Sequence, residues 1–494
     1  MRSFPMENKT LYLPGFHLET LRRTPRSARQ VLADKAAEIK NKSFGQLSEC
    51  FAQFIPRQHL QPAQSGVLSR RRFFSKENTF WAFFSQVLDA DGGCQEVVRK
   101  LQAFAAMQSK TLPSSSTAGY CQARKNLDRE SLQAIFQHTV KQLQATPDKS
   151  VLHGRRVVVV DGTGVSMPDT VQNQEVWPQQ KHQKPGCGFP QAAICACFCL
   201  QTGALLSYET GNKKSHELPL LRKQMKTFKA GDIFLGDKGF CSYYDVSAFK
   251  GRDVDSVITL ARRRPVSASE AVKVLGPDDV LVHWEKPKRT QRSSYSQEDW
   301  EGLPEKLLLR QIKVTVQQPG FRTSSFYMIT TLLDAEQYPA NELADLYLQR
   351  WDVELFFRDI KTTMGMDILR CKTPAMVNKE IVMHLIVYNC IRGLMMEAEN
   401  QVSDRLRRIS FKGANQALRQ WEPCLNQAKI SHQECTRLMA LLYDSIGKNI
   451  VPQRPGRSEP RAVKRRPKPF ALLTAPRHEM KEIKHRSKYT AKQA

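Results

Sequence analysis

The sequence predicts an α/β protein in which a mixed sheet with flanking helices follows an N-terminal helical domain. Two patterns predict this fold class. The first 150 residues hold amphipathic windows but no convincing strand alternation, whereas short apolar runs bounded by turn residues begin at Arg155. The composition agrees, because 41% hydrophobic and 25% charged residues over a length of 494 are ordinary for a globular chain. At roughly 100 to 200 residues per domain, this length predicts two to four domains.

Residues 1–150 are expected to form a helical, DNA-binding domain. Its helical windows are 26–51, 77–88, 94–107 and 118–143, which are separated by Ser, Pro and Gly residues. Basic clusters occur in this part of the chain at Arg22, Arg23, Arg26 and Arg29 and at Arg70, Arg71 and Arg72. These clusters are equally consistent with contacts to DNA phosphate and with a solvated surface.

Residues 151–260 are expected to form the first part of the α/β core. The four valines at 157–160 are typical of a strand that is buried on both faces. The further strands that we expect are 191–200 and 204–210, joined as a hairpin, then 232–237 and 254–260, with a helix over 217–227. Cys195, Cys197 and Cys199 alternate at period two, which favours one face of a buried strand over a metal site.

The remaining chain divides into three parts. Residues 261–335 are rich in Pro, Gly and charge and are interpreted as a β-rich insertion with strands over 308–316 and 325–332. Residues 336–450 are expected to be helical, in windows at 341–363, 379–399 and 405–445. The tail, 451–494, carries a net charge of +10 and should be disordered, because it cannot bury a core.

The formal net charge of +27 indicates a polyanionic partner, with nucleic acid as the first interpretation and an anionic membrane surface as the second. The chain holds no uninterrupted apolar run of the roughly 18 residues that a membrane span needs, and its first residues do not resemble a signal peptide. We therefore expect a cytoplasmic protein. Its 12 cysteines, which include no CxxC pair, are expected to be small buried residues.

Acidic residues at the ends of expected strands are the first candidates for a site. Asp161 follows the valine run and Asp237 follows the strand at 232–237, where open sheets tend to bind their ligands. Each could instead be a turn residue or a helix cap. Asp169, Asp232 and Glu217 are rival carboxylates, and Asp232 should lie at the opposite end of the sheet because it begins its strand.

The helix expected over 341–363 supplies a second group of candidates. At about 100° per residue, Tyr347, Arg350, Glu354 and Lys361 share one stripe about 60° wide. The rest of the circumference is mostly apolar, through Leu346, Leu348, Val353, Leu355, Phe356, Phe357 and Ile360. Such a helix should be buried, with its polar stripe facing a solvated cleft, although internal ion pairs such as Glu354 with Arg350 or Arg358 could also explain the stripe.

Two aspartates and a glutamate suit a metal-dependent reaction at phosphate. Carboxylate oxygens are ligands of Mg²⁺, and a pair of ions about 4 Å apart can bind both the attacking and the leaving oxygen of a phosphoryl displacement. Tyr, Arg and Lys beside the carboxylates would contact the phosphate. The site chemistry and the net charge thus indicate the same kind of substrate.

These residues resemble the signature of bacterial insertion-sequence transposases of the DDE type, in the fourth insertion-sequence family. Its Tyr, two residues, Arg, three residues, Glu, six residues, Lys pattern matches Tyr347, Arg350, Glu354 and Lys361. Asp161 and Asp237 match the two family aspartates, with separations of 76 and 117 residues along the series Asp161, Asp237, Glu354. The resemblance covers roughly residues 118–415.

The resemblance implies an RNase H-like catalytic core that cuts DNA at the terminal inverted repeats of its own element and joins the ends to target DNA. By analogy, Asp161, Asp237 and Glu354 hold two Mg²⁺ ions, for which Mn²⁺ could substitute, and a homodimer forms on the DNA. The insertion would hold DNA over the site through its basic segments 262–264 and 286–289. Some relatives stack a flipped base on a tryptophan of the insertion; Trp284 and Trp300 lie in that region, and each could equally be a packing residue.

Two other functions remain open at this stage. A nuclease of the same fold would hydrolyse DNA without strand transfer. A DNA-binding repressor would have an inactive site, although the presence of all three carboxylates makes that reading weaker.

Overall fold

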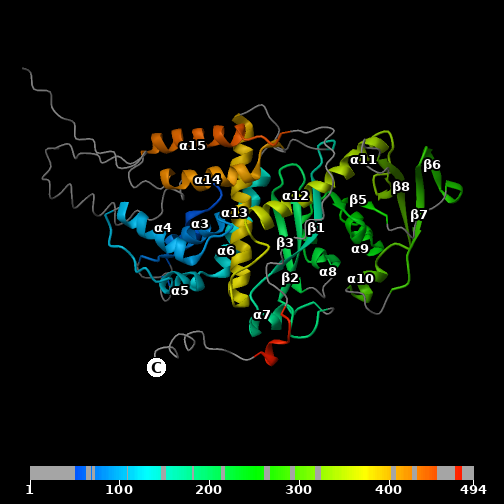
Figure 1. Ribbon diagram of the computed structural model, residues 1–494. Coiled ribbons are helices and arrows are strands. Elements are labelled where there is room, and N and C mark those ends of the chain that lie inside the picture. The colour runs from blue at the N-terminus through cyan, green and yellow to red at the C-terminus, as the bar shows by residue number, and fades with distance from the viewer. Residues whose placement is uncertain are drawn as a thin grey trace, which may run out of the picture.

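The computed structural model describes residues 51–62, 68, 73–107, 109–145, 152–180, 183–212, 217–260, 268–289, 295–316, 324–401, 408–425, 431–452 and 473–480. Several predictions fall outside the described residues: the helix 26–51 for all but its last residue, the arginine clusters at 22–29 and 70–72, the basic segment 262–264 and most of the tail. The long helix α13 (Pro374–Gln401) runs through the middle of the molecule, with helices on one side of it and the sheet on the other (Figure 1).

The described N-terminal helices are η1 (Arg57–Leu60), α3 (Lys76–Leu88), α4 (Cys94–Met107), α5 (Ala118–Asn126) and α6 (Arg129–Ala145). The predictions over 77–88 and 94–107 are confirmed. The single helix expected over 118–143 is two helices. Leu127 adopts an extended backbone, and the Asp128 carboxylate accepts a hydrogen bond from the Ser131 N–H, so the chain ends one helix and starts another.

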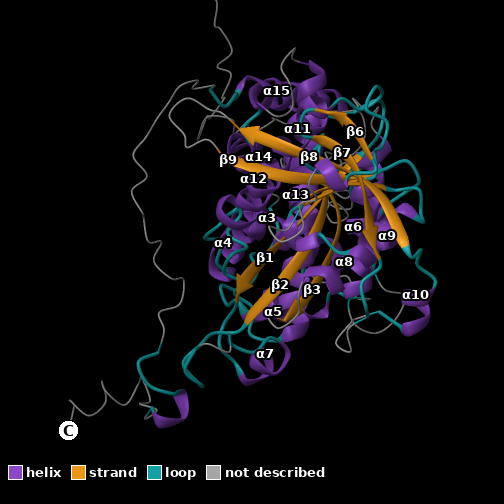
Figure 2. Ribbon diagram, turned by 90° about the vertical axis from the view of Figure 1, so that its right-hand side faces the viewer, coloured by secondary structure: helices purple, strands orange, loops and turns teal. Residues whose placement is uncertain are grey.

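The sheet has nine strands in the order β3-β2-β1-β4-β5-β9-β8-β7-β6. Its first half contains β1 (Val157–Ser166), β2 (Gln191–Cys199), β3 (Leu205–Asn212), β4 (Ile233–Gly236) and β5 (Asp255–Thr259). Strands β1, β2 and β3 pair antiparallel, and β4 and β5 continue parallel to β1. The expected mixed sheet with flanking helices is confirmed, and its connectivity is consistent with an RNase H-like fold (Figure 2).

The insertion supplies the second half of the same sheet. It contains β6 (Lys273–Gly276), β7 (Asp279–Glu285), α10 (Gln297–Glu301), β8 (Lys306–Val316) and β9 (Ser324–Thr330). Strand β9 pairs antiparallel with β5, so hydrogen bonds run without interruption from the core into the insertion. Strands were expected over 308–316 and 325–332 and are present, whereas the hairpin of β6 and β7 was not predicted.

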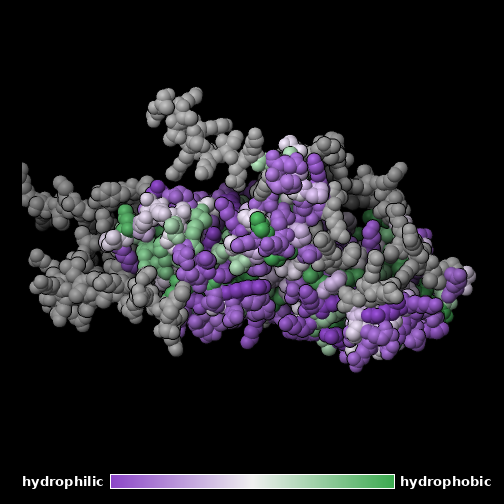
Figure 3. All heavy atoms as spheres, turned by 90° about the horizontal axis from the view of Figure 1, so that it is seen from below, coloured by the Kyte–Doolittle hydropathy of each residue, from purple (hydrophilic) through white to green (hydrophobic). Residues whose placement is uncertain are grey.

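Seen from below, hydrophilic side chains cover most of the described face (Figure 3).

Helices cover both faces of the first half of the sheet. The short helix α8 (Glu217–Arg222) contacts β2 and β3, and α12 (Asp352–Arg358) contacts β1. On β2, the Cys197 thiol reaches Gln224, just after α8, whereas Phe198 packs against Phe356 and Phe357 of α12. Because neighbouring side chains on a strand point to opposite faces, α8 and α12 lie on opposite faces of the sheet. The prediction that Cys195, Cys197 and Cys199 share one buried strand is also confirmed.

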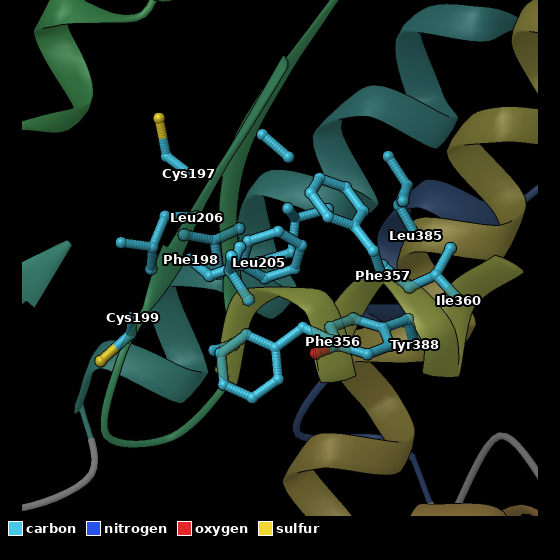
Figure 4. Close-up of a cluster of buried hydrophobic side chains, with 14 of the residues drawn as sticks. Cys197, Phe198, Cys199, Leu205, Leu206, Phe356, Phe357, Ile360, Leu385 and Tyr388 are labelled. Atoms are coloured by element: carbon cyan, nitrogen blue, oxygen red, sulfur yellow. The ribbon is translucent and has the colours of Figure 1, made fainter. Parts of the chain in front are cut away.

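The helix expected over 341–363 is present but not regular. It consists of α11 (Ala340–Leu348), the 3₁₀ turn η5 (Gln349–Trp351), α12 and the π turn η6 (Asp359–Thr363). The expectation that it is apolar and buried nearly all round is wrong, because Leu348, Trp351 and Leu355 are exposed. Its buried face is anchored by Phe356, Phe357 and Ile360, which pack among side chains of β2, β3 and α13 (Figure 4).

The remaining described elements connect or cover this framework. They are α7 (Val171–Val176), η2 (Met225–Thr227), η3 (Lys238–Phe240), α9 (Tyr243–Lys250), η4 (Ala268–Glu270), α14 (Phe411–Leu425), α15 (His432–Lys448) and η8 (Arg477–Glu479). The weak helical prediction over 405–445 corresponds to the two helices α14 and α15. Helix α13 is long and apolar enough to cross a membrane, but 94% of its most apolar window is buried inside the protein, as in a core helix.

Candidate active site

Asp161 and Asp237 lie at one edge of the core sheet, where β4 ends. The expectation that Asp161 ends its strand is wrong, since β1 continues to Ser166 because it pairs with β2 as far as Gln191. Strand β4 pairs only with residues 157–159 of β1. Asp161 therefore lies just beyond the last β1–β4 pair, and Asp237 directly follows β4.

Local hydrogen bonds fix both aspartates. The Asp161 Oδ1 accepts a hydrogen bond from the Gly162 N–H at 2.7 Å. The Asp237 Oδ1 caps η3 and accepts from the Gly239 N–H at 2.8 Å. The pKa of Asp161 is raised to about 6, first by burial and then by the carboxylates of Asp237 and Glu217, against the opposing effects of the Gly162 N–H and Arg350. Negative charge is thus concentrated at this edge.

Arg350 brings positive charge to the same edge from η5. Its side chain is only 9% exposed, and its Nη1 lies 3.8 Å from the Asp161 Oδ2. Within the described residues, its buried Nε has no hydrogen-bond partner. An arginine donor that is buried and unused beside a long ion pair is suited to an anionic ligand such as a phosphate.

Tyr347 is held against the sheet one turn before Arg350. Its hydroxyl pairs with the Thr259 hydroxyl at the end of β5, and its ring packs against Phe326 of β9 at 5.1 Å. Burial raises the pKa of this hydroxyl above its ordinary value, while Asp237 and Asp161 are near enough to raise it as well. The hydroxyl therefore stays protonated at neutral pH.

Lys361 reaches the same strand from the π turn. Its Nζ donates a hydrogen bond of 3.1 Å to the Thr163 Oγ1. Asp161 and Thr163 are two residues apart on β1 and share a face of the sheet. The structure therefore brings together Asp161, Asp237, Tyr347, Arg350 and Lys361.

Glu354 is the member of the predicted triad that stands apart. It lies on α12, one turn after Arg350, with its side chain exposed. In the part of the chain that the structure describes, it makes no hydrogen bond or ion pair. Across the same residues, no three His, Cys, Asp or Glu side chains stand in the arrangement of a preformed metal site.

The donor set nevertheless fits Mg²⁺. This ion prefers oxygen ligands, keeps several waters, and usually takes only one or two protein carboxylates together with substrate phosphates. Asp161 and Asp237 supply that pair, and burial, with a smaller effect of the carboxylates of Asp237 and Glu217, raises the pKa of Asp161. Glu354 is close in sequence to Arg350 and has a side chain that can rotate.

Of the three rival carboxylates, only Glu217 lies near Asp161. Asp232 lies at the opposite end of β4, as expected, and pairs there with Arg156. Asp169 accepts a hydrogen bond from the Gln174 side chain at 2.9 Å. Glu217, by contrast, lies beside Asp161, which the sequence did not indicate, because no spacing rule relates the start of a short helix to a strand 56 residues earlier.

Both candidate tryptophans of the insertion are buried. Trp300 stacks on Tyr295 at 5.2 Å, and Trp284 lies in the hydrophobic core. The burial favours packing, and base stacking stays a prediction. The segment 286–289 is also engaged internally, since Lys286 donates to the Leu303 carbonyl at 2.9 Å and Arg289 donates to the Tyr295 carbonyl at 2.7 Å.

The domain is thus of α/β class and carries two aspartates at one edge of its sheet. Residues 152–390 match the family model described as transposase DDE domain. The chain is also 26% identical over 424 residues to the transposase InsG for insertion sequence element IS4 of Escherichia coli (strain K12), a match that covers 84% of this chain and 90% of that protein. It is 28% identical over 92 residues to the transposase for insertion sequence element IS421 of Escherichia coli, covering 17% of this chain and 25% of that protein.

Over residues 152–390 the chain therefore matches the transposase DDE domain, and over most of its length it is similar to an insertion-sequence transposase. Asp161, Asp237 and the Tyr-Arg-Glu-Lys series all lie within the matched residues. The relatives' names carry no residue assignments, so the roles of individual side chains rest on their geometry in this structure.

Proposed function

We propose that this transposase binds the terminal inverted repeats of its own insertion sequence, cleaves the DNA there and transfers the cut strands to a target by two-metal phosphoryl transfer. One observation carries the proposal: Asp161 and Asp237 lie at one sheet edge beside the buried guanidinium of Arg350. This edge combines carboxylates for cations with a donor for phosphate.

The proposed metal ligands are Asp161, Asp237 and Glu354. Bound Mg²⁺, or Mn²⁺ in its place, would supply Lewis-acid activation and charge stabilisation to the attacking and leaving oxygens. The protein's own contribution is to hold the two aspartates rigidly through the Gly162 and Gly239 N–H groups. Glu354 is proposed to turn inward when cation and DNA are present.

Arg350, Lys361 and Tyr347 are proposed to position the scissile phosphate. The unused Nε of Arg350 and the Nζ of Lys361 would donate to phosphate oxygens, the latter by leaving or sharing its bond to Thr163. The Tyr347 hydroxyl is protonated and can donate as well. A phosphate held by these groups would lie next to the carboxylates, where the metal ions are proposed to bind.

The DNA complex is proposed to be a homodimer in the bacterial cytoplasm, associated with the nucleoid. The net charge of +27 supports recruitment of DNA through sequence-independent phosphate contacts, whose affinity falls steeply with salt. Sizing of the purified complex with terminal-repeat DNA by light scattering tests the dimer, and a single protomer per DNA end would contradict it.

The deciding experiment is a cleavage assay on DNA that carries the repeats flanking this reading frame. With Mg²⁺ we expect strand cutting at the repeat end and, with a target plasmid present, joined products. Cutting without joining would favour a nuclease of the same fold. Specific binding with no cutting in either Mg²⁺ or Mn²⁺ would favour a repressor and contradict the proposal.

A further inference from the structure

Glu217 begins helix α8 and reaches the strand that carries Asp161. A Cβ atom added to Gly162, the next residue after Asp161, would lie 1.8 Å from the Glu217 Oε1 and 2.4 Å from its Cδ. The carboxylate of Glu217 therefore occupies the place that any side chain at position 162 would take. Only glycine at this position lets the carboxylate approach the backbone of β1 so closely.

The other oxygen of Glu217 lies near Gly239, two residues after Asp237. A Cβ atom added to Gly239 would lie 3.8 Å from the Glu217 Oε2 and 3.0 Å from the Asp237 Oδ1. The Glu217 carboxylate thus lies near both β1 and η3. It arrives from the face of the sheet covered by α8, whereas the helix that carries Glu354 covers the opposite face.

We propose that Glu217 is a fourth carboxylate of the divalent-cation site, and that binding of the cation draws it together with Asp161 and Asp237. This inference deepens the proposed function and rests on it. The four carboxylates would then approach the cations from both faces of the sheet.

A purely structural role for Glu217 explains the arrangement less well. A side chain that only braces α8 against β1 could be a glutamine, which hydrogen-bonds without charge. A carboxylate here and that of Asp161 repel each other, and the Arg350 contact to Asp161 is long at 3.8 Å. A cation removes that repulsion and turns all three groups into ligands.

The test is Mn²⁺ binding, measured by electron paramagnetic resonance on the full chain alone and in complex with a terminal-repeat duplex. Glu217→Gln keeps the size of the side chain, and we expect it to weaken binding by about tenfold or more. Glu175→Gln on the exposed side of α7 is the matched control and should bind as wild type does. Equal Mn²⁺ affinity in Glu217→Gln and wild type would overturn the inference while leaving the proposed function intact. A wild-type chain that binds no Mn²⁺ in either state would overturn both.

A second pair of variants separates lost binding from lost folding. Gly162→Ala should displace the Glu217 carboxylate and reduce Mn²⁺ affinity about as much as Glu217→Gln does. In a Glu217→Ala background the added methyl meets no carboxylate, so Gly162→Ala should then change neither the melting temperature nor Mn²⁺ binding. Gly93→Ala, where an added Cβ meets nothing within 4 Å, is the control. Wild-type Mn²⁺ affinity in Gly162→Ala would contradict the placement of Glu217.

Discussion

The acidic side chains at the two ends of the parallel strands β1, β4 and β5 differ in how they are paired with arginines. At the end where β4 and β5 begin, Asp232 and Asp255 each accept a short bond from an arginine, at 2.5 Å from Arg156 and 2.6 Å from Arg155. At the other end, the carboxylates of Asp237 and Glu217 lie near Asp161, and the nearest arginine, Arg350, is 3.8 Å away. The paired end stabilises the fold, whereas at the crowded end burial and the neighbouring carboxylates disfavour the ionised form of Asp161. Four predictions test this contrast.

The largest effect is expected from neutralising the proposed metal ligands. Asp161→Asn, Asp237→Asn and Glu354→Gln should each lower the rate of terminal-repeat cleavage by about 10³-fold or more, because metal stabilisation of the transition state amounts to several kcal/mol. Binding to the repeat, measured by gel shift, should persist. Asp169→Asn is the control carboxylate and should cleave normally. If one of the three variants cleaves at the wild-type rate, the residue that it replaces is not a metal ligand.

Breaking the paired end should unfold the protein more easily. Arg156→Ala leaves the buried Asp232 carboxylate without its partner and should lower the free energy of unfolding by about 3–5 kcal/mol. Urea denaturation followed by circular dichroism measures this. Arg437→Ala, which removes an exposed pair with Glu434, should change little. Equal losses of unfolding free energy in the two variants would mean that the buried ion pair stabilises the fold no more than the exposed one.

Neutralising Asp161 at the crowded end should raise, not lower, the free energy of unfolding in the absence of metal. The pKa of Asp161 is about 6 in the folded chain against an ordinary 3.8, so the folded state holds this proton more tightly. The stability that the proton provides is complete below about pH 4 and is lost as the pH rises through 6. Asp161→Asn should therefore stabilise the metal-free chain at pH 7.5, by up to about 3 kcal/mol.

The measurement is thermal unfolding in chelator from pH 4.5 to 7.5. Burial also raises the pKa of Asp359 to about 6. The melting temperature of the variant should therefore still depend on pH, although less steeply. Millimolar Mg²⁺ should raise the melting temperature of wild type and not of Asp161→Asn. Identical pH slopes for the two chains would show that Asp161 is not under electrostatic strain.

The smallest effect is expected where one contact to phosphate is lost. Lys361→Met removes a charged donor and should slow cleavage by about tenfold, the equivalent of about 1.5 kcal/mol. Thr163→Val removes only the hydroxyl that Lys361 meets and should have a smaller effect. Single-turnover rates with pre-bound DNA report the chemical step. A wild-type rate in Lys361→Met would place this lysine away from the reacting phosphate.

Local pattern was sufficient to predict most of the core elements. Four consecutive valines predicted β1, and the run before Asp237 predicted β4, because both strands are buried and both are bounded by turn residues. The length of β1 was not predicted, because residues 162–164 are Gly, Thr and Gly and became strand only through pairing with β2. Tertiary pairing overrode a local turn signal there.

The candidate site was predictable where residues are close in sequence and less so where they are not. The helical period placed Tyr347, Arg350 and Lys361 on one side, and the structure brings them to the aspartates even though 3₁₀ and π turns interrupt the helix. Glu217 could not be singled out by the same reasoning, because its approach to β1 depends on Gly162, which lies on a different element. The burial of Trp284 and Trp300 likewise follows from packing with distant aromatic residues.

The pairing of β9 with β5 gives the insertion a protective role. Without residues 261–335, β5 would be the outermost strand, and its free N–H and C=O groups could recruit a strand from another molecule. In the intact chain the outermost strand on this side is β6, which has only four residues and begins with an exposed lysine, Lys273. Short, charged edges resist such association. A deletion intended to expose the active site would therefore be expected to leave the chain prone to aggregation.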